Sequence, residues 1–264
     1  MSDVTATVAF HGLDLPKRAP KPRTTGWTVL IDNGVPMRFF EDVIASAADY
    51  IDLVKFGWGT AIVSPVVSAK IDCLRAHDVD FYFGGTLFEK FYIQGKLDAY
   101  HAFCQSCACR YVEVSNGTIP LSNRQKSELI HTFAKDFYVL SEVGHKDARE
   151  ADKFTPTEWL TCIQEDLEAG AYKVITESRE SGTSGICQAD GTPRTGIVEQ
   201  IQASGIHADQ LIFEAPTKSL QTYFIERFGT NVCLGNIPMT DVISLETLRL
   251  GLRSDTFMHF ESLN

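Results

Sequence analysis

Residues 155–177, TPTEWLTCIQEDLEAGAYKVITE, are predicted to form a helix followed by a strand, and residues typical of helix and strand ends mark the boundaries of both. Thr155 is a residue that caps helix N-termini, and Pro156 suits the first helical position. Gly170 ends the helix, because glycine adopts the left-handed conformation without a steric penalty. The β-rich run Tyr172–Glu177 then ends on a charged residue, which is typical of a short buried parallel strand.

The same alternation runs along the whole chain. Eight β-rich runs are predicted as strands: Thr28–Asp32, Ile51–Lys55, Val79–Phe83, Tyr111–Ser115, Phe137–Glu142, Tyr172–Glu177, Gln210–Glu214 and Asn231–Gly235. Eight stretches of helical periodicity follow them in turn: Met37–Ala48, Ser64–Ala76, Lys96–Ala108, Arg124–Lys135, Pro156–Ala169, Gly196–Ser204, Leu220–Phe228 and Leu245–Leu252.

Eight strand–helix repeats in 264 residues predict an α/β protein with a single (β/α)8 TIM barrel. An open doubly wound sheet is the alternative, but such sheets usually have about six strands, and no glycine-rich dinucleotide turn follows the first strand here. We expect residues 24–264 to form the barrel. Residues 1–23 form an N-terminal extension, in which the proline-rich and basic stretch Pro16–Arg23 leads into the first strand.

The composition narrows the range of partners. A net charge of -10 argues against binding to nucleic acid or to an anionic membrane, and no apolar run approaches the length of a membrane span. Met1–Leu15 lacks the features of an export signal, so we expect a cytoplasmic protein, and the seven cysteines are expected to be reduced thiols. The oligomeric state, monomer or homo-oligomer, stays open.

Polar side chains follow almost every predicted strand, and in a barrel these positions meet at one mouth. They are Asp32, Lys55, Glu113, Ser115, Asn116, Glu142, Lys146, Glu177, Arg179, Glu180, Glu214 and Asn236. Four of them are glutamates at strand ends, and converging carboxylates repel unless they are paired or bind a metal. A hard divalent cation such as Mg²⁺ resolves that repulsion, and the alternative is ion pairing with the basic residues of the mouth.

Lys55 and Lys146 are the candidates for chemistry, since a lysine in such a mouth binds an anion, forms a Schiff base or transfers a proton. A structural ion pair is the alternative for each. The glycines of Gly84-Gly85 and of Gly235-Asn236 are candidates for exposing backbone N–H groups to a phosphate, although glycines at these places also serve tight turns. His101, Cys104, Cys107 and Cys109 lack the paired spacing of a zinc site, and we expect the thiols to pack as small hydrophobes.

Several ordered blocks of sequence resemble those of the phosphosulfolactate synthase family. They are Lys55-Phe56-Gly57-Trp58-Gly59-Thr60, Gly84-Gly85-Thr86-Leu87-Phe88-Glu89, Glu142-Val143-Gly144-His145-Lys146, Glu177-Ser178-Arg179-Glu180-Ser181-Gly182, Phe213-Glu214-Ala215-Pro216 and Leu245–Thr256. The resemblance extends from about Pro22 to Phe257.

The resemblance implies a Mg²⁺-dependent lyase-type TIM barrel that adds sulfite to phosphoenolpyruvate, giving (2R)-phospho-3-sulfolactate, as in coenzyme M biosynthesis. Lys146 matches the family's lysine and is the expected general acid. Lys55 and Arg179 would hold the phosphate, carboxylate or sulfite. The implied site is completed by three expected metal ligands and by polar contacts to substrate: Glu142, Glu177 and Glu214 for Mg²⁺, and Gly84, Gly85, Ser115, Asn116, Gly235 and Asn236 for the small anionic substrates.

The sequence departs from the family pattern close to the predicted mouth. Asn33 stands where a lysine is usual, and Asn116 stands where an aspartate is usual, so the charge around the pocket is redistributed. Two alternatives therefore stay open. One is a phosphoenolpyruvate-dependent enzyme that uses another nucleophile, and the other is a stress-associated homologue without catalysis, against which the convergence of charged groups counts.

Overall fold

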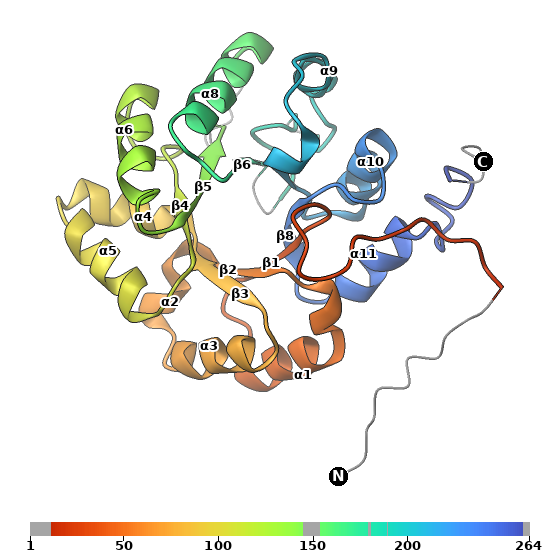
Figure 1. The fold of residues 1–264 in the computed structure, drawn as a ribbon, viewed down its shortest axis with the longest axis horizontal. Coiled ribbons are helices and arrows are strands. Elements are labelled where there is room, and N and C mark those ends of the chain that lie inside the picture. The colour runs from red at the N-terminus through yellow and green to blue at the C-terminus, as the bar shows by residue number, and fades with distance from the viewer. Residues whose placement is uncertain (1–11, 145–153, 179–180, 189, 261–264) are drawn as a thin grey trace.

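The computed structural model describes residues 12–144, 154–178, 181–188 and 190–260 (Figure 1). Its strands form one parallel sheet in the order β3-β2-β1-β8-β7-β6-β5-β4. The strands are β1 (Thr28–Asp32), β2 (Leu53–Phe56), β3 (Asp80–Phe83), β4 (Tyr111–Val114), β5 (Tyr138–Val143), β6 (Lys173–Thr176), β7 (Leu211–Glu214) and β8 (Leu234–Pro238). This confirms the predicted single (β/α)8 barrel.

Helices surround the barrel and cover its outer face (Figure 1). They are α1 (Met37–Ala47), α2 (Thr60–Val63), α3 (Val67–Ala76), α4 (Gly85–Ile93), α5 (Leu97–Ser106), α6 (Asn123–Phe133), α8 (Pro156–Glu168), α9 (Thr195–Ala203), α10 (Lys218–Phe228) and α11 (Val242–Arg249), with short 3₁₀ turns η1 (Ala48–Tyr50), η2 (Gly57–Gly59) and η3 (Ala208–Gln210). All eight predicted helices are present, with ends shifted by at most three residues. Helices α2 and α4 were not predicted, and Gly84-Gly85 was given as a candidate for exposing backbone N–H groups or for a tight turn.

The predicted capping box of α8 is present. Thr155 accepts a hydrogen bond from the Glu158 N–H, and the Glu158 carboxylate accepts one from the Thr155 N–H. Gly170 follows the helix with a φ of +105°, the left-handed region predicted for it.

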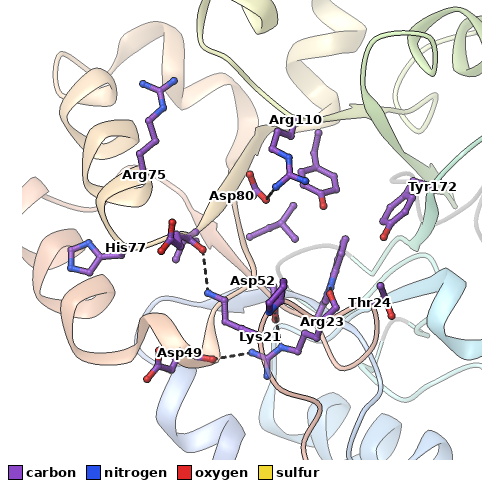
Figure 2. A pocket seen from close by; sticks show the side chains of 16 residues that line it. Lys21, Arg23, Thr24, Asp49, Asp52, Arg75, His77, Asp80, Arg110 and Tyr172 are labelled. Carbon is purple, nitrogen blue, oxygen red and sulfur yellow. Dashed lines mark hydrogen bonds and ion pairs between the residues drawn. The ribbon is translucent and has the colours of Figure 1, made fainter. Parts of the chain in front are cut away.

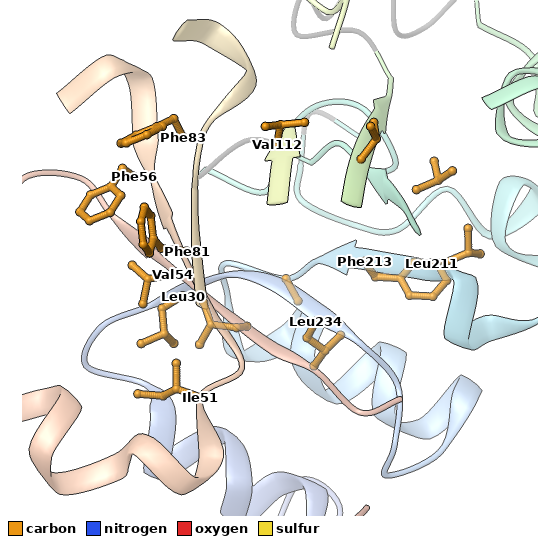
Figure 3. Close-up of a cluster of buried hydrophobic side chains, with 14 of the residues drawn as sticks. Leu30, Ile51, Val54, Phe56, Phe81, Phe83, Val112, Leu211, Phe213 and Leu234 are labelled. Carbon is orange, nitrogen blue, oxygen red and sulfur yellow. The ribbon is translucent and has the colours of Figure 1, made fainter. Parts of the chain in front are cut away.

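The core has two layers because strand residues alternate in direction. The outer layer packs the strands against the helices and contains residues such as Leu30, Val54, Val112 and Phe213 (Figure 3). The inner layer fills the barrel with side chains from alternate positions: Trp27, Val29, Leu53, Tyr82, Tyr111, Leu140, Ile175, Ile212 and Cys233. No helix of the described residues is long and apolar enough to cross a bilayer.

One joint of the barrel is closed by side chains. Strands β3 and β4 are the two ends of the sheet order, and within the described residues they share no hydrogen-bonded ladder. At the amino-terminal end of this seam, Arg110 Nη1 lies 2.9 Å from Asp80 Oδ2. At the carboxyl end, the Gly85 N–H donates to Glu113 Oε1 at 2.5 Å. The seam, by which we mean the boundary between β3 and β4, therefore has one polar contact at each end.

Candidate functional site

A cavity of about 240 Å³ lies at the carboxyl ends of the strands, where barrel enzymes carry their active sites. Side chains from strands and from the loops after them line it: Ile31, Lys55, Trp58, Gly84, Gly85, Thr86, Thr118, Glu142, Glu177, Glu214 and Asn236. Seven residues of the predicted site lie in this lining. Of the rest, Ser115, Asn116 and Gly235 are described but do not line the cavity, whereas Lys146 and Arg179 lie outside the described residues.

Lys55 occupies the centre of a group of glutamates. Its Nζ lies 3.0 Å from Glu113 Oε2, 3.4 Å from Glu214 Oε1 and 3.6 Å from Glu142 Oε2. Burial of the ammonium lowers its pKa, but the three carboxylates outweigh burial and raise the pKa well above 10.5. Lys55 is therefore a fixed cation at neutral pH, suited to holding charge and poorly suited to releasing a proton.

Glu113, the nearest of these carboxylates, is held by the start of α4. Its Oε1 accepts the Gly85 N–H at 2.5 Å, while its Oε2 faces Lys55. A Cβ on residue 85 would lie 2.3 Å from Ser115 Oγ and 2.5 Å from Glu113 Oε1, so only glycine fits here. The Gly84 N–H donates to the Phe56 carbonyl at 2.9 Å. Both glycine amides thus already have partners in the protein.

Ser115 lies just behind the cavity lining and is fully buried. Its hydroxyl donates to Glu89 Oε1 at 2.6 Å, which ties the end of β4 to α4. Asn116, the next residue, donates its side-chain amide to the Leu121 carbonyl at 2.9 Å and thereby holds the loop after β4. In this structure both side chains support the mouth.

Glu142, Glu177 and Glu214 bring carboxylate oxygens to the cavity wall, and each is at most 2% exposed. Glu214 is fixed by the segment that follows the neighbouring strand β6, since its Oε2 accepts the Ser178 N–H at 2.9 Å. Carboxylate oxygens are the donors that Mg²⁺ prefers, so the chemistry of this set fits the expected metal. Among the residues that the structure describes, no three aspartate, glutamate, histidine or cysteine side chains form a ready-made metal cluster.

Asn236 has two features of a binding residue. Its backbone has a φ of +53°, a left-handed conformation that costs energy for a residue with a side chain. Its Oδ1 is buried and has no hydrogen-bond partner in the described part of the chain, although the residue lines the cavity. An unsatisfied amide of this kind is costly unless a ligand, water or ion completes it. Gly235 precedes it in β8, and a Cβ there would lie 3.0 Å from Ile212 Cγ2.

Trp58 was missed by sequence reasoning, as were Ile31, Thr86 and Thr118. Trp58 has a φ of +50°, is 48% exposed and lines the mouth of the cavity. Its neighbours Gly57 and Gly59 were the available signal, because glycines on both sides of a tryptophan mark a tight turn.

Asp32 was expected at the mouth but faces the helices. Ile31 takes the inward position, and Asp32 Oδ2 pairs with the buried Lys70 of α3 at 2.6 Å. Cys104 and Cys109 are buried free thiols, as expected. His101 Nε2 lies 2.9 Å from Asp136 Oδ2.

A larger cavity, about 860 Å³, lies at the opposite, amino-terminal end of the barrel (Figure 2). Several of its charged groups bind one another or backbone: Arg23 pairs with Asp52 at 2.8 Å, Arg110 pairs with Asp80, and Lys21 donates to the Ile51 carbonyl at 2.7 Å. Because these charges are already satisfied within the protein, the smaller cavity is the better candidate for catalysis.

Comparison with known proteins gives a consistent answer. Residues 16–255 match the family model described as (2R)-phospho-3-sulfolactate synthase (ComA). A phosphosulfolactate synthase of Bacillus subtilis is 56% identical over 245 residues, which cover 93% of this chain and 97% of the relative. The phosphosulfolactate synthase of Methanocaldococcus jannaschii is 42% identical over 237 residues, covering 88% of this chain and 94% of the relative.

Solved structures support the fold alone. A 3-hexulose-6-phosphate synthase aligns with a TM-score of 0.52 at 15% identity, covering 83% of this chain and 97% of that one. A 3-keto-L-gulonate-6-phosphate decarboxylase of Vibrio cholerae aligns with a TM-score of 0.53 at 12% identity, covering 89% and 99%.

Proposed function

This chain belongs to the (2R)-phospho-3-sulfolactate synthase family, and on that premise we propose that it adds sulfite to phosphoenolpyruvate with the help of Mg²⁺. The observation that carries the proposal is the family match over residues 16–255, a range that includes every residue lining the 240 Å³ cavity. A cavity of that size suits a three-carbon phosphorylated carboxylate rather than a larger ligand.

The reaction builds negative charge and then needs one proton. The sulfur lone pair of sulfite forms a bond to C3 of phosphoenolpyruvate, and the C2–C3 π electrons move toward the carboxylate. C2 then accepts a proton, and the phosphate ester stays intact. The site must therefore stabilise an anionic transition state and deliver a proton to one face of C2.

Charge balance supports a divalent cation. Three glutamates, Glu113, Glu142 and Glu214, contact Lys55, and Glu177 lines the same cavity. Lys55 is the one cation among the described residues of the lining. An anionic substrate entering such a site needs further positive charge. Mg²⁺ commonly takes one or two carboxylates and completes its shell with substrate oxygens and water, and it would neutralise the charge developing on the substrate carboxylate. We assign Glu142, Glu177 and Glu214 as the residues that would hold it.

Lys55 and Lys146 take different roles in this proposal. Lys55, held among carboxylates with a raised pKa, orients and attracts the anionic substrate. Lys146, which follows β5 and matches the family's lysine, is the proposed proton donor, and Arg179 is a proposed anion contact. Asn236 supplies the best-supported polar contact, because its buried amide lines the cavity.

Two of the departures from the family pattern, Asn33 and Asn116, lie away from the cavity lining, which favours sulfite over another nucleophile. Asn33 is exposed, and the Asn116 side chain holds the loop after β4. A nucleophile screen with phosphoenolpyruvate would test the alternative directly.

Phosphorus NMR of a mixture of enzyme, phosphoenolpyruvate, sulfite and Mg²⁺ tests the proposal. We expect a new phosphate-ester signal that EDTA abolishes. Lys146→Met is expected to lower turnover by about 10²-fold or more, as loss of a general acid does, while the exposed Lys135→Met is the matched control and keeps full activity. Failure to form phosphosulfolactate would overturn the reaction, and equal turnover in the two variants would overturn the role of Lys146.

A further inference from the structure

A buried polar group lies directly behind β5, on the side of the strand that faces the helices. Lys126 of α6 places its Nζ 2.6 Å from Asp166 Oδ2 of α8, and the Ser141 hydroxyl of β5 donates to the same carboxylate oxygen. Lys126 and Asp166 are at most 1% exposed. The three residues thus join two helices and one strand away from solvent.

The group is connected to the cavity through the backbone of β5. Leu140 packs in the barrel interior and Glu142 lines the cavity, so Ser141 between them faces outward. Lys126 Nζ also donates to the Glu142 carbonyl at 2.9 Å. The ammonium therefore grips the residue whose carboxylate lies 3.6 Å from Lys55 Nζ on the other side of the strand.

Stability alone is a weak reason for this arrangement. Removing two charges from water costs several kcal/mol per ion, and apolar residues of similar volume often pack equally well. Asp166 Oδ1 is buried without a hydrogen-bond partner in the described part of the chain, which adds to the cost. The directed contact with the Glu142 carbonyl is what an apolar packing would not reproduce.

We propose that Lys126, Asp166 and Ser141 are positioning residues that fix the carboxyl end of β5 and so the place of the Glu142 carboxylate relative to Lys55. The inference rests on the proposed function only where kcat is measured, because that assay needs the proposed reaction. Lys126 is not itself a lining residue and acts through the backbone of β5.

The test is the double variant Lys126→Met/Asp166→Leu, which removes both charges and leaves neither uncompensated. We expect a thermal midpoint within a few degrees of the parent and a fall in kcat of about 10- to 100-fold, the range that misplacement by about 1 Å produces. The KM for phosphoenolpyruvate is expected to change much less. Unchanged kcat in a folded double variant would overturn the inference.

Lys173→Met is the matched control. Lys173 is also a buried lysine that donates to backbone carbonyls, those of Thr24 and Asp209, but it does so at the amino-terminal end of β6. We expect this variant to lose stability and to keep the parent kcat. An equal fall in kcat in both variants would assign the effect to general loosening of the barrel and overturn positioning.

A crystal structure of the double variant gives a readout independent of activity. The expected result is a Glu142 Oε2 to Lys55 Nζ distance well beyond the present 3.6 Å, and an unchanged distance would refute the inference. If the parent enzyme forms no phosphosulfolactate, the proposed function fails and this distance alone decides the inference. If the double variant does not fold, Ser141→Ala carries the test, with a smaller fall in kcat at unchanged stability expected and no fall refuting it.

Discussion

Gly85→Ala is the smallest substitution that tests the architecture of the site. The added Cβ would lie 2.3 Å from Ser115 Oγ, 2.5 Å from Glu113 Oε1 and 2.8 Å from Ser115 Cβ. Ordinary contact begins near 3.4 Å, so the Ser115 hydroxyl and the Glu113 carboxylate each have to move by about 1 Å. Ser115 cannot move freely, because it is fully buried and its hydroxyl is bound to Glu89.

The magnitude follows from three contributions. Overpacking of a tight site costs about 1–3 kcal/mol. Loss of the hydrogen bond from the Gly85 N–H to the Glu113 carboxylate costs about 1.5–3 kcal/mol. Alanine returns up to about 1 kcal/mol through its higher helix propensity in α4. The net loss is about 1.5–5 kcal/mol, or a thermal midpoint lower by roughly 3–20 °C.

Activity should fall as well, because Glu113 is the carboxylate nearest to Lys55. A displacement of about 1 Å is expected to lower kcat/KM by about 10- to 100-fold. Calorimetry and steady-state kinetics measure the two effects. Gly196→Ala is the control, since its Cβ would meet Pro156 Cγ at an ordinary 3.8 Å and is expected to stabilise the chain by about 0.4–1 kcal/mol. If both variants behave alike in melting and in kinetics, the crowding argued for residue 85 is wrong.

Three further predictions concern the mouth and its support. Lys55→Met removes the cation that three buried glutamates contact and is expected to lower the free energy of unfolding, measured in urea, by about 3–5 kcal/mol. The pKa of Lys55 in the folded state lies above 10.5, so its contribution to stability is fully present below pH 10.5 and is lost only as pH rises through the folded-state pKa. The free energy of unfolding in urea should therefore show no change due to Lys55 between pH 6 and 9. Trp58→Asn relieves the left-handed backbone strain at φ +50° and should raise the free energy of unfolding by about 1 kcal/mol. The same variant should raise the KM for phosphoenolpyruvate. A lower melting temperature would contradict the strain argument. Thr155→Ala removes the cap of α8 and should cost about 1 kcal/mol with kcat unchanged, so a loss of activity would show that the cap does more than end a helix.

Sequence patterns predicted most of the fold because barrel elements obey local rules. The ends of β1 were predicted at the residues where the structure has them, and α8 was predicted to begin at Pro156, as its capping box requires. Helix α4 was missed, since a glycine pair before a helix looks the same in sequence as a glycine pair in a turn.

The site was predictable where it depends on strand ends and not where it depends on loops. Lys55, Glu142, Glu177 and Glu214 all reach one cavity, as convergence at the mouth predicts. Asp32 shows the limit of that rule, because a strand end points inward or outward by the parity of its position. Trp58 and Thr118 lie on loops whose paths are set by packing, so no periodicity indicates where their side chains go.

The seam between β3 and β4 differs from the other strand pairs of the barrel in the kind of contact that closes it. Seven neighbouring strand pairs are joined by backbone hydrogen bonds, which moderate acid and salt do not alter. The β3–β4 pair is instead joined by polar contacts of Asp80 and Glu113 at its two ends. The ion pair between Arg110 and Asp80 is largely exposed and is screened by salt, so the contact between Gly85 and Glu113 near the candidate cavity contributes more to closing the barrel. Glu113 therefore joins the seam to the cavity, because one of its carboxylate oxygens accepts the Gly85 N–H and the other lies 3.0 Å from Lys55 Nζ.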